Sequence, residues 1–150
     1  MKNKLTVNQV ITLKNITYKV IGIDTYKLNN VFGKTKQWIS YTLTDSKKNK
    51  TWISYGISGD YFTQWASLTE AEFKKKATVS PNLDLSGIAQ ISFKGNPGFS
   101  TPIAEIVWFN VANQNYNYLS IERFLKQHEE TIIPLESYYL TGTILKEFRP

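Results

Sequence analysis

The tetrapeptide Trp-Ile-Ser-Tyr occurs twice in this chain, at residues 38–41 and 52–55, on either side of a lysine-rich segment. Each copy begins a stretch that alternates with period two and is rich in Trp, Ile, Tyr and Thr, as β-strands are. Two such stretches separated by a short polar segment form a hairpin. The repeat therefore predicts antiparallel strands over residues 38–44 and 51–57.

The loop of this hairpin fixes its predicted register. Lys47, Lys48 and Asn49 are expected to form a three-residue loop, in which Asn49 takes the left-handed backbone conformation. This register gives one wholly apolar face, whereas a slip by one residue would mix the two faces. The pairs expected on the apolar face are Leu43 with Ile53, Tyr41 with Tyr55, and Ile39 with Ile57.

The opposite face of the hairpin combines two indole rings with a basic loop. Trp38 and Trp52 alternate there with Ser and Thr, and Lys47, Lys48 and Lys50 lie in or beside the loop. Aromatic surface next to positive charge is the combination that holds single-stranded nucleic acid. The other interpretation is that both indoles pack in the interior, and it is favoured because a large aromatic side chain is seldom left in water.

A related pattern returns 66 residues later, in residues 105–124. Its loop, residues 113–115, again ends in Asn and is again flanked by alternating apolar stretches. Similarity at one constant offset indicates an internal duplication, with repeats over about residues 9–79 and 80–148. The equivalent pairs in the second hairpin are Phe109 with Leu119 and Val107 with Ile121.

Further strands are predicted on both sides of these hairpins. Residues 9–28 contain two strands joined at Lys14-Asn15, and residues 88–95 form another that ends at Asn-Pro-Gly in residues 96–98. A final strand is expected within residues 137–148.

Two segments fit a short helix as well as a strand. Residues 67–76 contain a capping box in Ser67 and Glu70, and residues 120–130 have helical composition. The Ser-Pro-Asn stretch at residues 80–82 is the expected connection between the two repeats.

Taken together, these signals predict a single all-β domain with minor helix. A chain of 150 residues, of which 41% are hydrophobic, can bury one core but is short for two domains. The strands are expected to form a meander that curls into a partly closed barrel or two packed sheets. Cysteine is absent, which excludes disulfides, thiolate metal sites and cysteine nucleophiles.

The net charge of +6 is unevenly distributed along the chain. Residues 1–76 carry thirteen lysines and five acids, or +8, whereas residues 77–150 carry five basic residues and seven acids, or −2. An anionic partner is expected at the N-terminal half, and solubility is the competing explanation of the charge. Neither a signal peptide nor an apolar run long enough to span a membrane is found, so we expect a soluble cytoplasmic protein.

Short motifs follow one another in a characteristic order. They are Tyr18-Lys19-Val20-Ile21-Gly22, Trp38-x-x-Tyr41-x-Leu43, Trp52-Ile53 with Gly59 beyond, Leu119-Ser120-x-Glu122, and Gly142. This order resembles that of the bacterial domain-of-unknown-function family 4178 over nearly the whole chain. Ser40 stands where the resemblance implies an acidic residue. The resemblance implies a small β-rich bacterial module without assigned catalytic residues.

Signals for catalysis are sparse. His128, the only histidine, lies beside Glu129 and Glu130, and a small hydrolase built around it is the alternative from a different functional class. A solvated histidine is the favoured interpretation, because sequence neighbours do not face each other on a helix. The sequence shows no recurrent metal-ligand spacing and no glycine-rich phosphate loop, so neither a metal nor a cofactor is expected.

The leading functional hypothesis is a non-enzymatic binding module. Its partner is a protein or another macromolecule with an acidic surface, and the expected contacts are Trp38, Lys47, Lys48, Lys50 and Trp52. Binding of single-stranded nucleic acid through the basic half is the alternative within this class. The sequence leaves the oligomeric state open, and it leaves the pathway open among bacterial stress response, phage conflict and toxin neutralisation.

Overall fold

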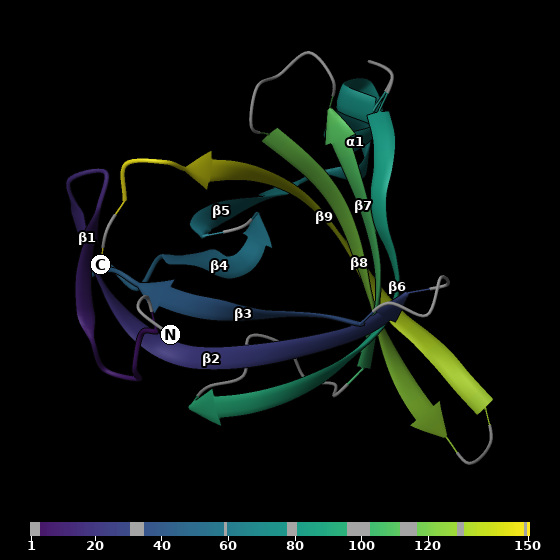
Figure 1. Cartoon of the computed structure of the whole chain (residues 1–150), viewed down its shortest axis with the longest axis horizontal. Helices are drawn as coiled ribbons and strands as arrows, with labels where there is room; N and C mark the ends of the chain where they lie inside the picture. The colour runs from purple at the N-terminus through teal and green to yellow at the C-terminus, as the bar shows by residue number, and fades with distance from the viewer. Residues whose placement is uncertain are drawn as a thin grey trace.

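The computed structural model describes residues 4–30, 35–58, 60–77, 81–95, 103–111, 117–128, 131–148 and 150. These residues form nine strands and one short helix (Figure 1). The elements are β1 (Val10–Leu13), β2 (Ile16–Asn30), β3 (Thr35–Thr44), β4 (Lys50–Ser58), β5 (Tyr61–Leu68), α1 (Glu70–Ala77), β6 (Pro81–Gly95), β7 (Ile103–Val111), β8 (Asn117–His128) and β9 (Thr131–Leu145).

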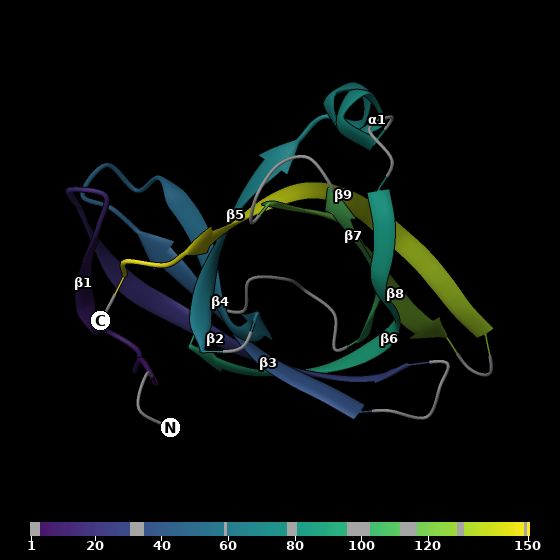
Figure 2. The ribbon, with the colours of Figure 1, turned by 45° about the horizontal axis from the view of Figure 1, so that its top comes forward.

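All nine strands belong to one antiparallel sheet, and the predicted all-β class with minor helix is confirmed. Neighbouring strands follow the order β1-β2-β3-β4-β5-β9-β8-β7-β6. β6 also pairs with β2, from Gly22 opposite Gly95 to Asn30 opposite Gly87, so the curled sheet returns to its second strand. The strands thus form a single curled sheet and not two packed sheets. Figure 2 shows β2–β9 curving around a common interior.

The sheet consists of two meanders, β2–β5 and β6–β9, with α1 between them. They meet through equivalent strands, because β5 pairs with β9 and β2 pairs with β6. The two predicted hairpins occupy equivalent places as β3–β4 and β7–β8, and the predicted pairing of Phe109 with Leu119 is confirmed. A duplicated four-strand unit would produce this arrangement. The duplication itself stays a prediction, and its loop at residues 113–115 lies outside the described residues.

The first hairpin has the predicted faces but a different register. Tyr41 lies opposite Ile53, and Ile39 lies opposite Tyr55, so each pair is displaced by two residues from the predicted one. Because side chains alternate with a period of two, a displacement of two residues leaves the side chains up to Tyr55 on their predicted faces.

A longer loop than predicted causes this displacement. The loop covers residues 45–49, and the Asp45 carboxylate accepts hydrogen bonds from the backbone N–H groups of Lys47 and Asn49, both at 2.9 Å. Lys48 and not Asn49 adopts the left-handed conformation, with φ of 64°. An aspartate that bonds to its own following backbone is a local turn signal, and it determines the length of this loop.

A bulge at Gly56 changes the face at the end of β4. Gly56 has φ of 100°, and the pairing with β5 shifts register between Tyr55 and Ser58. Ile57 consequently joins the interior cluster, where it is buried, instead of facing Ile39 as predicted.

The outward face of β2–β5 is covered by segments near the two ends of the chain. Tyr41, Leu43 and Ile53, predicted to be core residues, are each 0% exposed. They belong to a cluster with Leu5, against which Phe148 packs. The Tyr41 hydroxyl accepts a hydrogen bond from the backbone N–H of Leu5 at 3.3 Å. The apolar face predicted for the hairpin is therefore confirmed as a core.

The other predicted strands are present and longer than expected. β1 and β2 join at Lys14 and Asn15, whose φ values of 50° and 65° are those of a tight hairpin turn. The strand predicted over residues 88–95 is the second half of β6, and the one within residues 137–148 is the end of β9. Pro81, in the expected connection, begins β6, and residues 96–98 lie outside the described part of the chain.

The segment at residues 67–76 forms the helix α1 after its first residues. Thr69 and Glu72, not Ser67 and Glu70, make the capping box: the backbone N–H of Thr69 donates to the Glu72 carboxylate at 3.0 Å, and the backbone N–H of Glu72 donates to the Thr69 hydroxyl at 3.1 Å. Within the described ranges, no helix combines the length and apolar composition that crossing a membrane requires.

The segment at residues 120–130, for which a helix was the alternative, is a strand as far as residue 128. β8 pairs with β7 on one edge and with β9 on the other. Hydrogen bonding along both edges overrides the helical composition, since propensity is a weak preference beside tertiary pairing.

Candidate functional site

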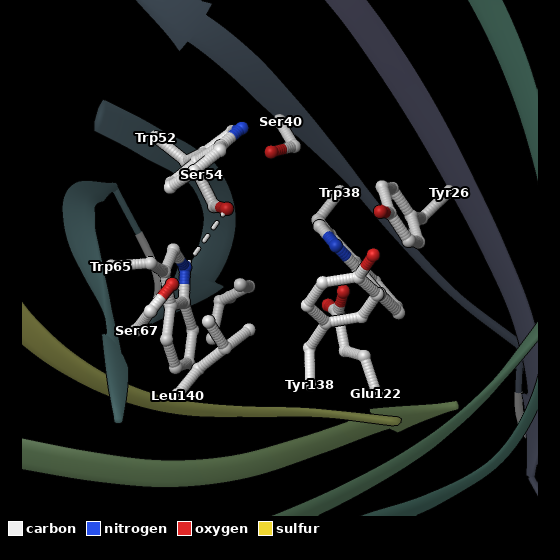
Figure 3. Close-up of a pocket in the computed structure, with 11 residues that line it drawn as sticks. Tyr26, Trp38, Ser40, Trp52, Ser54, Trp65, Ser67, Glu122, Tyr138 and Leu140 are labelled. Atoms are coloured by element: carbon white, nitrogen blue, oxygen red, sulfur yellow. Dashed lines mark hydrogen bonds between the residues drawn. The ribbon is translucent and has the colours of Figure 1, made fainter. Parts of the chain in front are cut away.

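The interior of the curled sheet contains a cavity of about 220 Å³. Its wall comes from β2, β3, β4, β5, β8 and β9, so residues from distant parts of the sequence meet there (Figure 3). The lining residues are Tyr26, Trp38, Ser40, Trp52, Ser54, Ile57, Trp65, Ser67, Glu122, Tyr138 and Leu140.

Five of the eleven residues that line the cavity are aromatic. The rings of Tyr26 and Trp38 are stacked, with centroids 4.9 Å apart and planes 17° from parallel. The indole N–H of Trp65 donates a hydrogen bond to the Ser54 hydroxyl at 3.0 Å, which holds that ring in one orientation. Trp52 pairs with Trp65 across β4 and β5. Three tryptophans and a stacked tyrosine therefore face one space.

Gly142 leaves room for the Trp65 ring. The two residues are paired between β5 and β9, and a Cβ atom at position 142 would lie 2.6 Å from a carbon of the Trp65 ring. Any larger residue would displace the indole, so close packing explains a glycine in the middle of this strand. The glycine of the late sequence motif thus positions one wall of the cavity.

Buried polar side chains gather on the interior face of the sheet. The alternation of side chains along each strand places them there, whereas the outward face of β2–β5 buries an apolar cluster. Polar groups without partners weaken a core, and three of these residues, Ser40, Ser54 and Glu122, line the cavity, which is typical of a binding site. The buried polar residues of the described chain are Asp24, Ser40, Thr42, Ser54, Thr63, Ser120 and Glu122.

Glu122 is the acidic group of the cavity wall. It is 8% exposed, and its Oε2 atom has no hydrogen-bond partner among the described residues. Burial, together with the nearby negative charge of Asp24, raises the pKa of Glu122 to about 8. Burial also raises the pKa of Tyr26 well above its ordinary value, with the charges of Glu122 and Asp24 adding to the effect. At neutral pH the Glu122 carboxyl is therefore mostly protonated.

The indole Nε1 of Trp52 is a second polar atom without a partner among the described residues. In Figure 3, Trp52 and Trp65 lie on one side of the cavity, and Trp38, Tyr138 and Glu122 lie on the other. A buried donor or acceptor left without a partner costs about 1–3 kcal/mol. A guest that bonds to Trp52 or Glu122 would recover part of this cost.

The structure separates the residues that the sequence placed in one binding site. Trp38 is 3% exposed and Trp52 is half-buried, and both line the interior, which confirms the interpretation that these indoles pack inside. Lys47, Lys48 and Lys50 are exposed in or beside the loop between β3 and β4. The two indoles therefore do not form an open stacking surface beside the lysines, as single-stranded nucleic acid would require.

The residues of the cavity that the sequence interpretation missed include Trp65, Glu122 and Tyr138. Trp65 lies in a strand that was not predicted, and Glu122 lies in the segment for which a helix remained an alternative. One signal was available for Glu122. In a strand, Ser120 and Glu122 point to one side and the apolar Leu119 and Ile121 point to the other. The alternation therefore predicts that Glu122 lies on the polar side of this strand.

The residues of the hydrolase alternative, His128, Glu129 and Glu130, lie at or beyond the edge of the described part of the chain. β8 ends at His128, whose side chain is not among those described, and residues 129 and 130 lie outside the described ranges. No cluster of three or more metal-ligating side chains occurs in the part of the chain that the structure describes.

Comparisons of the chain with protein-family models, with curated proteins and with solved structures give no match. The resemblance to the bacterial family 4178 therefore rests on the sequence motifs alone and stays a proposal. The geometry of the cavity is the basis on which a function can be inferred.

Proposed function

We propose that this protein is a non-enzymatic binding protein for a small molecule that contains an aromatic ring. The observation that carries the proposal is the interior cavity, which is lined by aromatic rings and has two polar atoms, Trp52 Nε1 and Glu122 Oε2, without hydrogen-bond partners among the described residues. Ligand sites in proteins are typically concave and aromatic, with a small number of placed polar groups. The module thus keeps the binding role expected from the sequence, with a small ligand in place of a macromolecule.

The size of the cavity limits the ligand. Sites for drug-sized molecules have volumes of roughly 300–1,000 Å³, and an apolar cavity of about 150 Å³ holds benzene. A cavity of about 220 Å³ lies between these cases. It fits one ring with a short substituent.

Access to the cavity is consistent with ligand exchange. Among its lining residues, Ser67 is exposed and Tyr138 is 36% exposed, so the wall formed by β5 and β9 reaches the surface. The Tyr138 ring lies edge-on to Phe124, with centroids 5.3 Å apart. A ligand that enters beside Tyr138 would meet Trp38 and Glu122 next.

Filling the cavity should abolish binding without unfolding the protein. Ser40→Leu puts a larger apolar side chain into the space, and we expect it to remove binding of single-ring fragments such as 2-phenylethanol and phenethylammonium. The measurement is the NMR shift of the Trp52 and Trp65 indole N–H signals during titration with each fragment.

Thr25→Leu serves as the matched control, because Thr25 lies on β2 with an exposed side chain outside the cavity. It should bind the fragments as the parent does. Fragments that shift the indole signals equally in the Ser40→Leu variant would place binding elsewhere, and parent protein that binds no fragment would overturn the proposal.

A second candidate function rests on the loop between β3 and β4. Lys47, Lys48 and Lys50 are all exposed there, and the hydrogen bonds of Asp45 hold the loop in one conformation. A fixed cluster of positive charge supports electrostatic attraction of an acidic macromolecular surface. Of the residues expected to contact a macromolecule, the three lysines remain accessible on the surface, and the two tryptophans are not part of this candidate contact.

Reversing the charge of this loop tests the second candidate. Replacing Lys47, Lys48 and Lys50 by Glu should weaken binding to an anionic surface such as heparin or single-stranded DNA, and binding by the parent should weaken steeply with added salt. Retention on a heparin column at increasing salt measures both effects. Equal retention of parent and variant would assign these lysines to solubility.

A further inference from the structure

We propose that the ligand of the interior cavity is a small organic cation: an ammonium group attached to one aromatic ring, with the ammonium held beside Glu122 and the ring among the tryptophans. This inference rests on the proposed function and specifies its ligand class. Three observations support it: the charge of the wall, the aromatic faces, and the carboxyl oxygen without a partner.

The charge of the cavity favours a cation over an anion. Glu122 is part of the wall, and Asp24 lies close enough for its charge to oppose ionisation of Glu122. The described residues that line the cavity include no lysine, arginine or histidine. The charge of Asp24 beside a wall that has no basic residue produces a negative potential, to which Glu122 adds when it is ionised, and a positive ligand would be stabilised by it.

The aromatic residues favour the same kind of ligand. Tyr26, Trp38, Trp52, Trp65 and Tyr138 all line the cavity, and the stacked pair of Tyr26 and Trp38 lies on the same side as Glu122 (Figure 3). The face of an aromatic ring is electronegative and attracts an ammonium group, most strongly when water is excluded. A carboxylate within such a wall adds a charged hydrogen bond to an ammonium N–H.

A neutral ligand would use these groups less completely. A protonated Glu122 could donate a hydrogen bond to a carbonyl oxygen, and Trp52 Nε1 could donate another. Neither bond would offset the negative charge of Asp24. The carboxyl group of Glu122 and the ring faces of the wall stabilise positive charge, and no basic residue lines the described wall, so we assign the cation as the ligand.

Binding of a cation is coupled to loss of a proton. The titratable groups that face Glu122 from the neighbouring strands are Asp24, Tyr26 and Tyr138. An ammonium beside Glu122 favours the ionised carboxylate, so the carboxyl, whose pKa in the protein is about 8, should release about one proton per ligand at pH 7. A neutral ligand should release none.

Three probes of similar size and different charge test the inference. Isothermal titration calorimetry of the parent should show phenethylammonium binding about tenfold or more tightly than 2-phenylethanol, and no binding of 3-phenylpropionate.

Titrations at pH 7 in two buffers with different ionisation enthalpies should show release of about one proton with phenethylammonium only. Glu122→Gln should lose the preference for the cation and the proton release, and its circular dichroism spectrum should match that of the parent. Glu147→Gln, at an exposed position outside the cavity, should behave as the parent does.

The outcomes separate this inference from the proposed function. If 2-phenylethanol or 3-phenylpropionate binds as tightly as phenethylammonium, or if Glu122→Gln leaves the preference unchanged, the ligand class is wrong and the small-ligand function stands. If none of the three probes binds to the folded parent, both are wrong. The circular dichroism spectrum of Glu122→Gln shows whether the variant is folded.

Discussion

Phe62→Ala is expected to lower the free energy of unfolding by about 3–5 kcal/mol, the range for removal of a buried aromatic ring. Phe62 is 1% exposed on the outward face of β5. Its ring centroid lies 6.4 Å from that of Tyr41, 5.0 Å from Tyr55 and 5.2 Å from Phe148. The side chain therefore joins β3 and β4 to the C-terminal segment, and a cavity there removes contacts in three directions. Urea denaturation followed by circular dichroism measures the change.

Tyr61→Ala is the matched control for this experiment. Tyr61 precedes Phe62 on the same strand and is 40% exposed. Its substitution by Ala removes a ring of similar size. We expect a change within about 1 kcal/mol, since surface substitutions seldom cost more. Equal losses for the two variants would mean that the face assigned to β5 is wrong.

Glu122 should make the protein less stable as the pH rises. The pKa of Glu122 is about 8 in the folded protein, against an ordinary value of 4.5. Below pH 4.5 the group is protonated in both states and costs nothing. Between pH 4.5 and 8 the unfolded chain releases the proton and the folded chain keeps it, so stability falls by up to about 1.4 kcal/mol per pH unit. Above pH 8 both states are ionised and the loss is complete.

Glu122→Gln tests this dependence, because glutamine has a similar shape and does not titrate. Relative to the parent, the variant should become progressively more stable from pH 5 to pH 8, as measured by urea denaturation at several pH values. Glu147→Gln, at an exposed position, should follow the profile of the parent. A constant difference between Glu122→Gln and the parent would show that the carboxyl is not buried as the structure places it.

The cavity is the feature that sequence reasoning did not find, although four of its eleven lining residues had been placed on the same face. Period-two alternation put Trp38, Ser40, Trp52 and Ser54 on one face, and they lie on one face in the structure. Alternation gives the face of a residue and not what covers that face. Here it is covered by β5, β8 and β9, which approach only because β5 pairs with β9 and β6 pairs with β2.

By itself, the sequence determined the all-β class, the two hairpins and the apolar core around Tyr41, because these depend on alternation and on turns between neighbours. The tertiary structure alone decided the rest. It moved Ile57 inward through the bulge at Gly56 and brought Glu122 to the cavity wall. Both depend on pairing between strands whose proximity a linear pattern does not encode. The register of the first hairpin follows instead from a local signal, because the Asp45 carboxylate bonds to the backbone of the loop that it begins. The unusual pKa of Glu122 has the same origin, because burial and the charge of Asp24 arise only when β2 and β8 face the same interior.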